Sequence, residues 1–332
     1  MSDLLKNIDA RTRLAGTNKL EILLFTLGVD QRTGRRETFG INVFKVREVM
    51  RTPAITAAPE MPSSVEGMVS LRGVLVPVVD LAKYVGIGAE EKTVRDIMIV
   101  TEYNGHTQGF LVEAVDTILR LDWSQMRVPP DMLTAHMGGL VTAVTELEGN
   151  KLVMLLDVEK VLSETTKYDD DNQLFKDIKP IENADRYTVV FADDSSVARK
   201  QIIQTLDMIG VKYVGAVNGR QAWEELKKIA DNCAATGRKV SDVVSLVLTD
   251  VEMPEMDGYI LTRHVKSDPR FEGVPVVMHS SLSGMSNQQL GISVGVDEYV
   301  PKFEPLRLSQ TLRRMILGEK TEETDPAATE QK

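Results

Sequence analysis

Carboxylates, a hydroxyl and an amine follow successive short apolar runs in the second half of the chain. Asp193 and Asp194 come directly after one such run, and Asp250 ends another. Ser280 and Lys302 each follow a further run. Apolar runs that alternate with helical patterns predict a five-stranded parallel sheet. Because ligands bind at the carboxyl ends of such strands, we expect these five side chains to share one crevice.

The residue types in this crevice suit phosphoryl transfer. Clustered carboxylates repel one another unless a cation is present, and oxygen ligands of this kind suit Mg²⁺. A carboxylate can attack a phosphoryl group and form an aspartyl phosphate, and a hydroxyl and an ammonium can hold the remaining phosphoryl oxygens. Taken singly, an Asp-Asp pair is usually a turn or a helix cap. The ordered combination at successive strand ends is what indicates a phosphorylation site.

Residues 187–318 resemble a response-regulator receiver domain of the CheY kind, which has a flavodoxin-like α/β fold. The resemblance rests on the segments 192–195, 250–258 and 299–302. It implies that the domain takes a phosphoryl group onto one of its own aspartates, with Mg²⁺ as cofactor. We therefore expect no enzyme acting on an external substrate, although the domain could autodephosphorylate.

The resemblance also assigns roles to individual residues. It implies that Asp250 is the phospho-acceptor, and that Asp193, Asp194, Asp250 and the backbone carbonyl of Glu252 bind Mg²⁺. It makes Lys302 the lysine that contacts the phosphoryl group.

Two further residues receive switch roles by the same resemblance. Ser280 is implied to be the switch hydroxyl and Tyr299 the aromatic switch. One departure from the family pattern concerns the adjacent loop. Receivers usually place a proline with a cis bond after the lysine, whereas here Phe303 follows the lysine and Pro301 precedes it. This departure leaves the geometry of the loop open.

The first half of the chain has a different pattern. Between residues 17 and 162 short strand-like segments recur at close spacing, which indicates an all-β barrel or sandwich. The predicted strands are 20–27, 38–43, 74–79, 97–101, 109–115 and 151–156. We find no catalytic set in this half, so a binding module is the simplest interpretation.

Three segments of this half, 45–49, 70–81 and 153–162, are similar to CheW-type coupling domains. That resemblance implies two small β-barrels side by side, which bridge chemoreceptor tips and the regulatory domain of the histidine kinase CheA. Arg72 and Glu48 lie in two of the matched segments, and we expect them to meet across the fold and shape a docking surface. The alternative is an ordinary exposed ion pair.

The length, net charge and cysteine content of the whole chain limit which partners and which cellular compartment we expect. Its 332 residues favour two domains, and its net charge of −10 disfavours nucleic-acid binding. A single cysteine, Cys233, fits a reducing cytoplasm. Because no signal peptide or membrane-spanning run is evident, we expect a cytoplasmic protein without direct membrane insertion, held at receptor arrays by its partners.

The predicted organisation has five parts. They are an N-terminal helix or arm (1–16), the coupling domain (17–162), an acidic linker (163–186), the receiver (187–318) and a disordered tail (319–332).

The order of the two domains resembles CheV-type chemotaxis coupling proteins. It implies a signal-transduction scaffold that couples chemoreceptors to CheA and is modulated, in adaptation, by phosphorylation at Asp250. An alternative is a phosphate sink that drains phosphoryl groups from the kinase. A third interpretation, a haloacid-dehalogenase-like phosphatase, is disfavoured because Glu252 stands where that class has a second aspartate.

Overall fold

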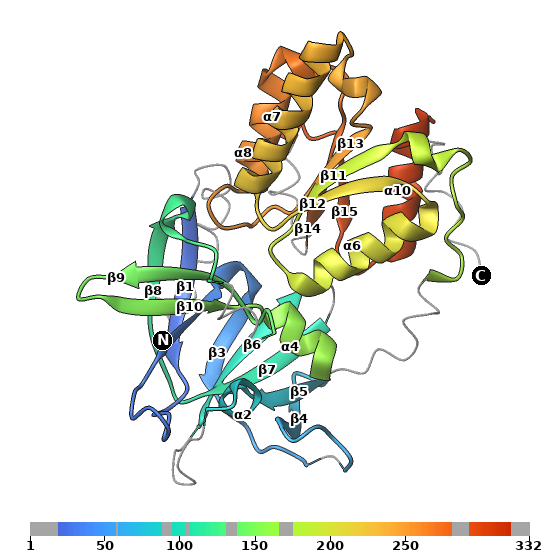
Figure 1. Ribbon diagram of the computed structural model, residues 1–332. Helices are drawn as coiled ribbons and strands as arrows, with labels where there is room; N and C mark the ends of the chain where they lie inside the picture. Colours follow the sequence, from blue (N-terminus) through green and yellow to red (C-terminus); the bar gives the residue numbers. More distant parts are fainter. Residues whose placement is uncertain are drawn as a thin grey trace.

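The computed structural model describes residues 19–57, 59–87, 95–103, 106–130, 138–165, 175–280 and 292–319 (Figure 1). The predicted N-terminal helix or arm and residues 320–332 of the predicted tail lie outside this part of the chain.

The N-terminal half contains two five-stranded sheets, with strand orders β8-β1-β2-β10-β9 and β3-β6-β7-β5-β4. The first is built from β1 (Lys19–Thr26), β2 (Thr38–Asn42), β8 (Ala114–Asp122), β9 (Val141–Leu147) and β10 (Lys151–Leu156). The second is built from β3 (Val46–Arg51), β4 (Val65–Leu71), β5 (Val74–Asp80), β6 (Ile97–Tyr103) and β7 (His106–Val112). This β-rich half confirms the predicted all-β coupling domain.

The strands that the sequence pattern missed as separate elements all lie at sheet edges. β8 and β9 flank the first sheet, and β3 and β4 flank the second. An edge strand is exposed on more sides than a central one, and in β3 and β8 this exposure weakens the apolar alternation. β8, for example, has no fully buried residue. The central strands, which carry the strong apolar runs, were the ones predicted.

Three apolar clusters hold this half together. One belongs to the first sheet and centres on Ile22 and Trp123. Another belongs to the second sheet and centres on Val78 and Met98. The third joins residues of both sheets to a short helix, and its members include Phe25, Phe39, Ile99, Phe110 and Val161. The shared cluster packs the two sheets and the helix into one unit.

That short helix, α4 (Val158–Thr165), follows β10 directly. The side chain of Asp157 caps it by accepting the N–H groups of Glu159 and Lys160 at 3.1 and 3.2 Å. The helix continues to Thr165, so residues 163–165, which we placed in the linker, are helical. The other short helices of this half are η2 (Val43–Lys45), α2 (Leu81–Val85) and η3 (Trp123–Gln125).

The C-terminal half is a five-stranded parallel sheet of order β12-β11-β13-β14-β15. Its strands are β11 (Thr188–Ala192), β12 (Lys212–Ala216), β13 (Leu246–Thr249), β14 (Val276–Ser280) and β15 (Glu298–Pro301). β13 and β14 are buried throughout, as expected for central strands covered on both faces. This topology confirms the predicted flavodoxin-like receiver.

Helices cover both faces of this sheet (Figure 1). One face carries α6 (Ser196–Ile209) and α10 (Pro305–Leu317), and the other carries α7 (Gly219–Thr236) and α8 (Gly258–Ser267). Shorter 3₁₀ turns are η4 (Ala184–Arg186), η5 (Val240–Asp242) and η6 (Pro269–Phe271). Among the residues that the structure describes, these helices lie along the faces of the sheet, and the carboxyl ends of the strands lie at its edge.

Part of the predicted acidic linker packs against the receiver. Phe175, Ile178, Ile181 and Ala184 are buried in the cluster that also contains α6 and α10. Residues 166–174 lie outside the described part of the chain. The second half of the segment therefore belongs structurally to the receiver.

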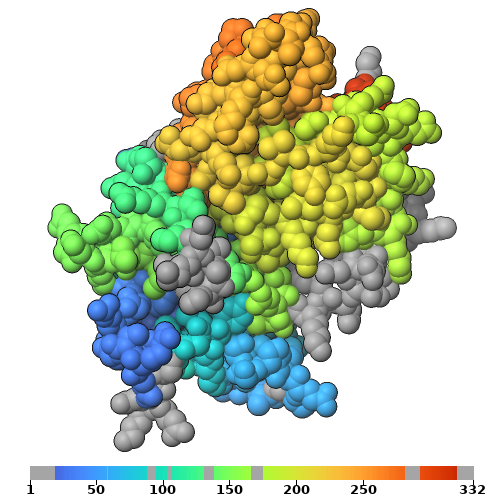
Figure 2. Space-filling model, viewed as in Figure 1, coloured from blue at the N-terminus to red at the C-terminus, as the bar shows by residue number. Residues whose placement is uncertain are grey.

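The two domains touch at the carboxyl edge of the receiver sheet. The backbone N–H of Glu255 donates to the carbonyl oxygen of Trp123 at 3.1 Å, and α4 lies beside α6. Figure 2 shows the green atoms of the N-terminal half against the yellow and orange atoms of the receiver. The crevice expected at the strand ends is thus also a domain boundary. None of the helices within the described residues combines the length and apolarity needed to cross a membrane.

Candidate functional site

Three carboxylates meet where the receiver strands end. Asp193 and Asp194 follow β11, and Asp250 follows β13. One oxygen from each lies within 4.8 Å of the others. β11 and β13 are hydrogen-bonded neighbours, with Ala192 paired to Thr249, so their ends must lie side by side. The structure confirms the convergence that the strand-end pattern predicts.

Local hydrogen bonds fix the first pair of carboxylates. Asp193 Oδ1 accepts the backbone N–H of Ser195 at 2.9 Å, and Ser195 in turn caps α6. The guanidinium of Arg199 donates to the backbone carbonyls of Asp193 and Asp194 at 2.9 and 2.8 Å. The turn between β11 and α6 is therefore held from both sides, which sets the direction of its two acidic side chains.

Lys302 completes the cluster from the end of β15. Its Nζ lies 3.0 Å from Asp193 Oδ2 and 3.0 Å from Asp250 Oδ2. Its backbone N–H donates to the carbonyl oxygen of Ser280 at 3.2 Å, which ties the ends of β14 and β15 together. The described residues contain no cis peptide bond, and the residue after the lysine, Phe303, has φ of +62°. A left-handed residue therefore makes the turn where the family pattern has proline.

Gly258 lets the acceptor strand pack closely. A Cβ at this position would lie 1.9 Å from the carbonyl oxygen of Asp250. The preceding Asp257 caps α8 by accepting the N–H of Ile260 at 2.7 Å. The Asp257-Gly258 pair thus starts a helix directly against the site, and a larger residue at 258 would displace the backbone of Asp250.

The electrostatics of the cluster are dominated by burial. Burial raises the pKa of Asp250 to about 7, although the attraction of Lys302 opposes this. Burial, reinforced by the charge of Asp250, raises the pKa of Asp194 well above its usual range. Burial also raises the pKa of Asp193. Burial acts to lower the pKa of Lys302, but the charges of the surrounding carboxylates outweigh it and raise the value.

This donor set fits a magnesium ion. Three carboxylate oxygens within reach of one another are hard ligands, and Mg²⁺ prefers a few carboxylates together with water and phosphate oxygens. The three carboxylates outnumber the ammonium of Lys302. Burial contributes most to the raised pKa values of Asp194 and Asp250, and repulsion between the carboxylates adds to it. A divalent cation would relieve that repulsion.

The remaining predicted receiver residues lie around this cluster. Ser280 is buried at the end of β14. The hydroxyl of Tyr299 donates to the hydroxyl of Tyr259 at 3.2 Å. Burial raises the pKa of the Glu252 carboxyl to about 7, although a hydrogen bond with the Asn42 side chain opposes it. The roles of Ser280, Tyr299 and the Glu252 carbonyl remain predictions.

Sequence reasoning missed that the N-terminal domain also supplies side chains to this site. Glu159 is 1% exposed, and its Oε2 lies 3.8 Å from Lys302 Nζ. Lys45 Nζ lies 3.0 Å from Glu159 Oε1. Both residues lie in segments that resemble CheW-type domains, 45–49 and 153–162, but nothing in those segments indicated a contact with the receiver.

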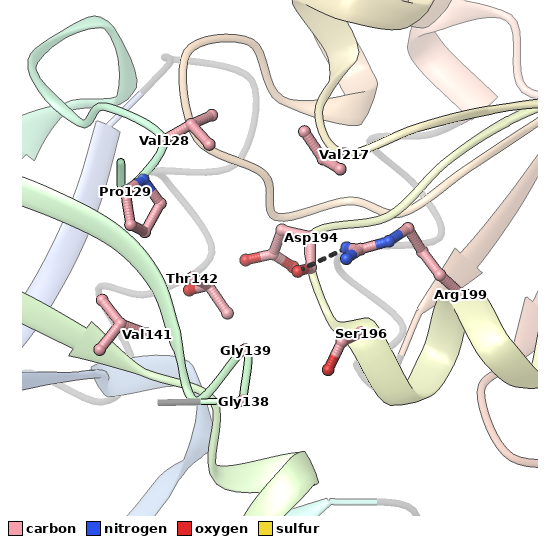
Figure 3. A pocket seen from close by; sticks show the side chains of 10 residues that line it. All are labelled: Val128, Pro129, Gly138, Gly139, Val141, Thr142, Asp194, Ser196, Arg199 and Val217. Atoms are coloured by element: carbon pink, nitrogen blue, oxygen red, sulfur yellow. Dashed lines mark hydrogen bonds between the residues drawn. The ribbon is translucent and has the colours of Figure 1, made fainter. Parts of the chain in front are cut away.

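A cavity of about 400 Å³ opens beside the acidic cluster, between the two domains. Asp194, Ser196 and Arg199 line it from the receiver, and Gly139, Val141 and Thr142 line it from the N-terminal domain. In Figure 3 the carboxylate of Asp194 points into this space. The cavity gives the acidic cluster a side that is not filled by protein.

On the other face of the N-terminal domain, Arg72 and Glu48 form the expected contact. Arg72 Nη2 lies 2.9 Å from Glu48 Oε2, and the two side chains are 71% and 19% exposed. Arg72 and Gly73 both have positive φ, which gives the tight two-residue turn between β4 and β5. Val74 and Leu75 beside it are exposed. The pair therefore borders an apolar surface.

Comparison with known proteins agrees with both halves of this architecture. Residues 21–166 match the model of the CheW-like domain, and residues 189–313 match that of the response regulator receiver domain. Chemotaxis protein CheV1 of Helicobacter pylori is 27% identical, and the alignment covers 95% of this chain and 99% of that protein. The chain belongs to the CheV-type family of chemotaxis coupling proteins.

Relatives of the separate halves are more similar in sequence. Chemotaxis protein CheW of Klebsiella aerogenes is 33% identical over 46% of this chain and 87% of its own length. Chemotaxis protein CheY1 of Helicobacter pylori is 33% identical over 39% of this chain and 96% of its own length. The protein is thus a chemotaxis scaffold with a CheW-like domain and a receiver domain.

Removing the two charges of Asp193 and Asp194 should abolish Mg²⁺ binding and stabilise the metal-free fold. In Asp193→Asn/Asp194→Asn we expect no heat of Mg²⁺ binding by calorimetry. We also expect a melting temperature about 3 °C higher at pH 8 without metal. Both carboxyls have raised folded-state pKa values, so their ionisation lowers stability as the pH rises above about 4.

The gain in stability should therefore shrink as the pH falls toward about 4, where both carboxyls are protonated. The control is Asp207→Asn/Asp231→Asn, which removes two exposed carboxylates elsewhere on the receiver. Unchanged Mg²⁺ affinity in the first variant would refute the metal site.

Proposed function

We propose that this chain links chemoreceptors to the histidine kinase CheA through its CheW-like domain, and that phosphorylation of Asp250 modulates the link. The observation that carries the proposal is the Asp250 carboxylate, held 3.0 Å from Lys302 inside a cluster of acidic metal-ligand candidates. A scaffold without a regulatory role would gain nothing from burying such a cluster, because buried charges of one sign are costly.

The geometry around Asp250 supports its role as nucleophile. Its Oδ1 accepts the backbone N–H of Val251 at 2.6 Å, and its Oδ2 contacts Lys302 Nζ at 3.0 Å. In the transfer, a carboxylate oxygen forms a bond to phosphorus while the bond between phosphorus and the donor breaks. The leaving group departs with that bonding pair. The product is an aspartyl phosphate.

Other residues of the chain hold the transferred group. Lys302 is placed to pair with a phosphoryl oxygen, since its ammonium already lies beside the attacking carboxylate. Ser280, at the end of the adjacent strand, can donate its hydroxyl to another. Asp193, Asp194 and Asp250 would hold Mg²⁺, which when bound supplies charge neutralisation for the phosphoryl group.

The CheW-like half supports the coupling role. Arg72, at the turn of the β4–β5 hairpin, forms an ion pair with Glu48 of β3, next to the exposed side chains of Val74 and Leu75. An exposed apolar patch with a charged rim is typical of a protein-binding surface. We propose that this surface contacts the receptor or the kinase.

The alternative of a pure phosphate sink is less well supported. In a sink, the CheW-like half would merely localise the receiver, and contact between the halves would serve no purpose. Here residues of the CheW-like half lie against the acceptor site, with Glu159 Oε2 3.8 Å from Lys302 Nζ. This contact favours communication between the two domains.

Asp250→Asn should abolish phosphorylation. In the presence of Mg²⁺, we expect labelling from a phosphohistidine kinase or from acetyl phosphate to fall below about one-hundredth of the wild-type level, because an amide is not a nucleophile toward phosphorus. Asp207→Asn, which removes an exposed carboxylate of α6, serves as control and should label normally. Undiminished labelling of Asp250→Asn would contradict the assignment, provided peptide mapping shows no neighbouring acceptor.

Charge reversal at Arg72 should weaken partner binding without unfolding the domain. We expect Arg72→Glu to lower affinity for receptor tips or for kinase about tenfold, and Glu48→Arg in the same chain to restore part of it. A double-mutant cycle on binding measures this coupling. An exposed pair by itself contributes at most about 1 kcal/mol to folding, so thermal stability should barely change.

The matched control is Arg120→Glu. Arg120 Nε pairs with Glu21 Oε1 at 3.0 Å on the other sheet. Its exposure, 55% for the arginine and 14% for the glutamate, resembles that of the Arg72 pair. If Arg72→Glu binds both partners as tightly as this control, Arg72 is not part of the coupling surface.

A further inference from the structure

The acceptor site of the receiver is covered by the N-terminal domain. Asp250 is 5% exposed and Lys302 is 2% exposed, and residues of the N-terminal domain contribute to this burial. The cover comes from α4 and from the segment that ends β2 and forms η2. Glu159 of α4 lies 3.8 Å from Lys302, and Lys45 of η2 lies 3.0 Å from Glu159.

Each of these side chains meets a charge of opposite sign in the site. The carboxylate of Glu159 shares Lys302 with Asp193 and Asp250. The positive charge of Lys45 interacts favourably with Asp194 as well as with Glu159. The contact between the domains therefore pairs a carboxylate of the N-terminal domain with the ammonium of the receiver site.

Adjacent to this ion cluster, polar contacts extend the interface. The Asn42 side chain hydrogen-bonds the carboxyl of Glu252, and the backbone of Glu255 donates to Trp123 at 3.1 Å. Gly139 approaches the start of α6 so closely that an added Cβ would lie 3.3 Å from the Cβ of Ser196. The two domains thus meet along a continuous surface around the acceptor.

Phosphorylation would reverse this complementarity. An aspartyl phosphate carries nearly two negative charges in place of the single charge of the carboxylate, beside the lysine that Glu159 already contacts. Both would compete for the ammonium of Lys302. A divalent cation beside Asp194 would at the same time repel the ammonium of Lys45. Both changes oppose the docked arrangement of the domains.

We propose that the surface formed by Asn42, Lys45 and Glu159 is an intramolecular docking site for the unphosphorylated receiver, and that phosphorylation of Asp250 releases it. This inference rests on the proposed function of Asp250. It assigns Glu159 a definite part: its carboxylate occupies the phosphoryl side of Lys302 and is displaced when the phosphoryl group arrives. The signal then passes within one chain as a change from docked to separated domains.

A disulfide between positions 139 and 196 can lock the docked state. The expected Cβ–Cβ separation of 3.3 Å at Gly139 and Ser196 is close to the range of about 3.5–4.5 Å found in disulfides. The full-length variant is Gly139→Cys/Ser196→Cys with the native buried thiol removed by Cys233→Ala. Labelling of Asp250 is then followed with acetyl phosphate and Mg²⁺, before and after reduction.

We expect the oxidised form to be labelled at least tenfold more slowly than the reduced form. Equal rates would overturn the inference, because docking would then not compete with phosphorylation. Failure of the two cysteines to cross-link in the unphosphorylated chain would also overturn it. Absence of labelling in the reduced form and in wild type would instead defeat the proposed function, so the two failures are distinguishable.

The same cysteine pair also tests whether Glu159 mediates the release of the receiver. Beryllofluoride with Mg²⁺ serves as a phosphoryl mimic, and we expect it to slow disulfide formation at least fivefold. In the Glu159→Gln background this effect should fall below twofold, because the repelling carboxylate is gone. Glu164→Gln is the matched control, since Glu164 lies on the same helix and pairs with Lys160 and Tyr84 of its own domain. An equal beryllofluoride effect in both variants would remove Glu159 from the mechanism.

Discussion

The ammonium of Lys302 is the charge on which the site depends. It lies 3.0 Å from Asp193, 3.0 Å from Asp250 and 3.8 Å from Glu159, all in a setting almost closed to solvent. Uncompensated carboxylates at that depth would cost several kcal/mol each. One lysine cannot neutralise three or four of them, so the cluster retains an excess of negative charge. That excess attracts a divalent cation and repels additional negative charge.

The sheet holds the side chains of the site in nearly fixed positions. β11, β13, β14 and β15 run parallel, and their ends carry Asp193, Asp250, Ser280 and Lys302 in turn. The turns are tightened by local features, such as the Ser195 cap of α6 and the close approach of Gly258 to the Asp250 carbonyl. If Asp250 is the nucleophile, as we propose, a carboxylate held in this way needs little rearrangement before transfer.

The relation between the halves gives the scaffold a way to respond. Its CheW-like domain presents the Arg72 hairpin on one side and Glu159 with Lys45 on another. The first surface faces solvent, whereas the second is occupied by the receiver. A charge change at Asp250 acts directly on the occupied surface, because the groups concerned are a few ångströms apart and poorly screened. No relay through the core of either domain is required.

The sequence by itself determined much of the receiver. Apolar strands alternating with helices dictate a parallel sheet, and in such a sheet residues that follow neighbouring strands must meet, so Asp193, Asp194, Asp250 and Lys302 could be placed together before any coordinates. The central strands of the CheW-like half were likewise predictable. Its edge strands β3, β4, β8 and β9 were not predicted as separate elements, and in β3 and β8 partial exposure blurs the apolar alternation.

Tertiary structure alone decided what covers the acceptor site. Lys45, Glu159 and Lys302 are separated by more than a hundred residues along the chain, and each looks like an ordinary charged residue in its own segment. Their meeting depends on how two independently folded surfaces dock, which no local periodicity or turn signal records. The left-handed turn at Phe303 was hidden for a related reason. Its φ of +62° is imposed by the surrounding loop and not by the residue's own preference.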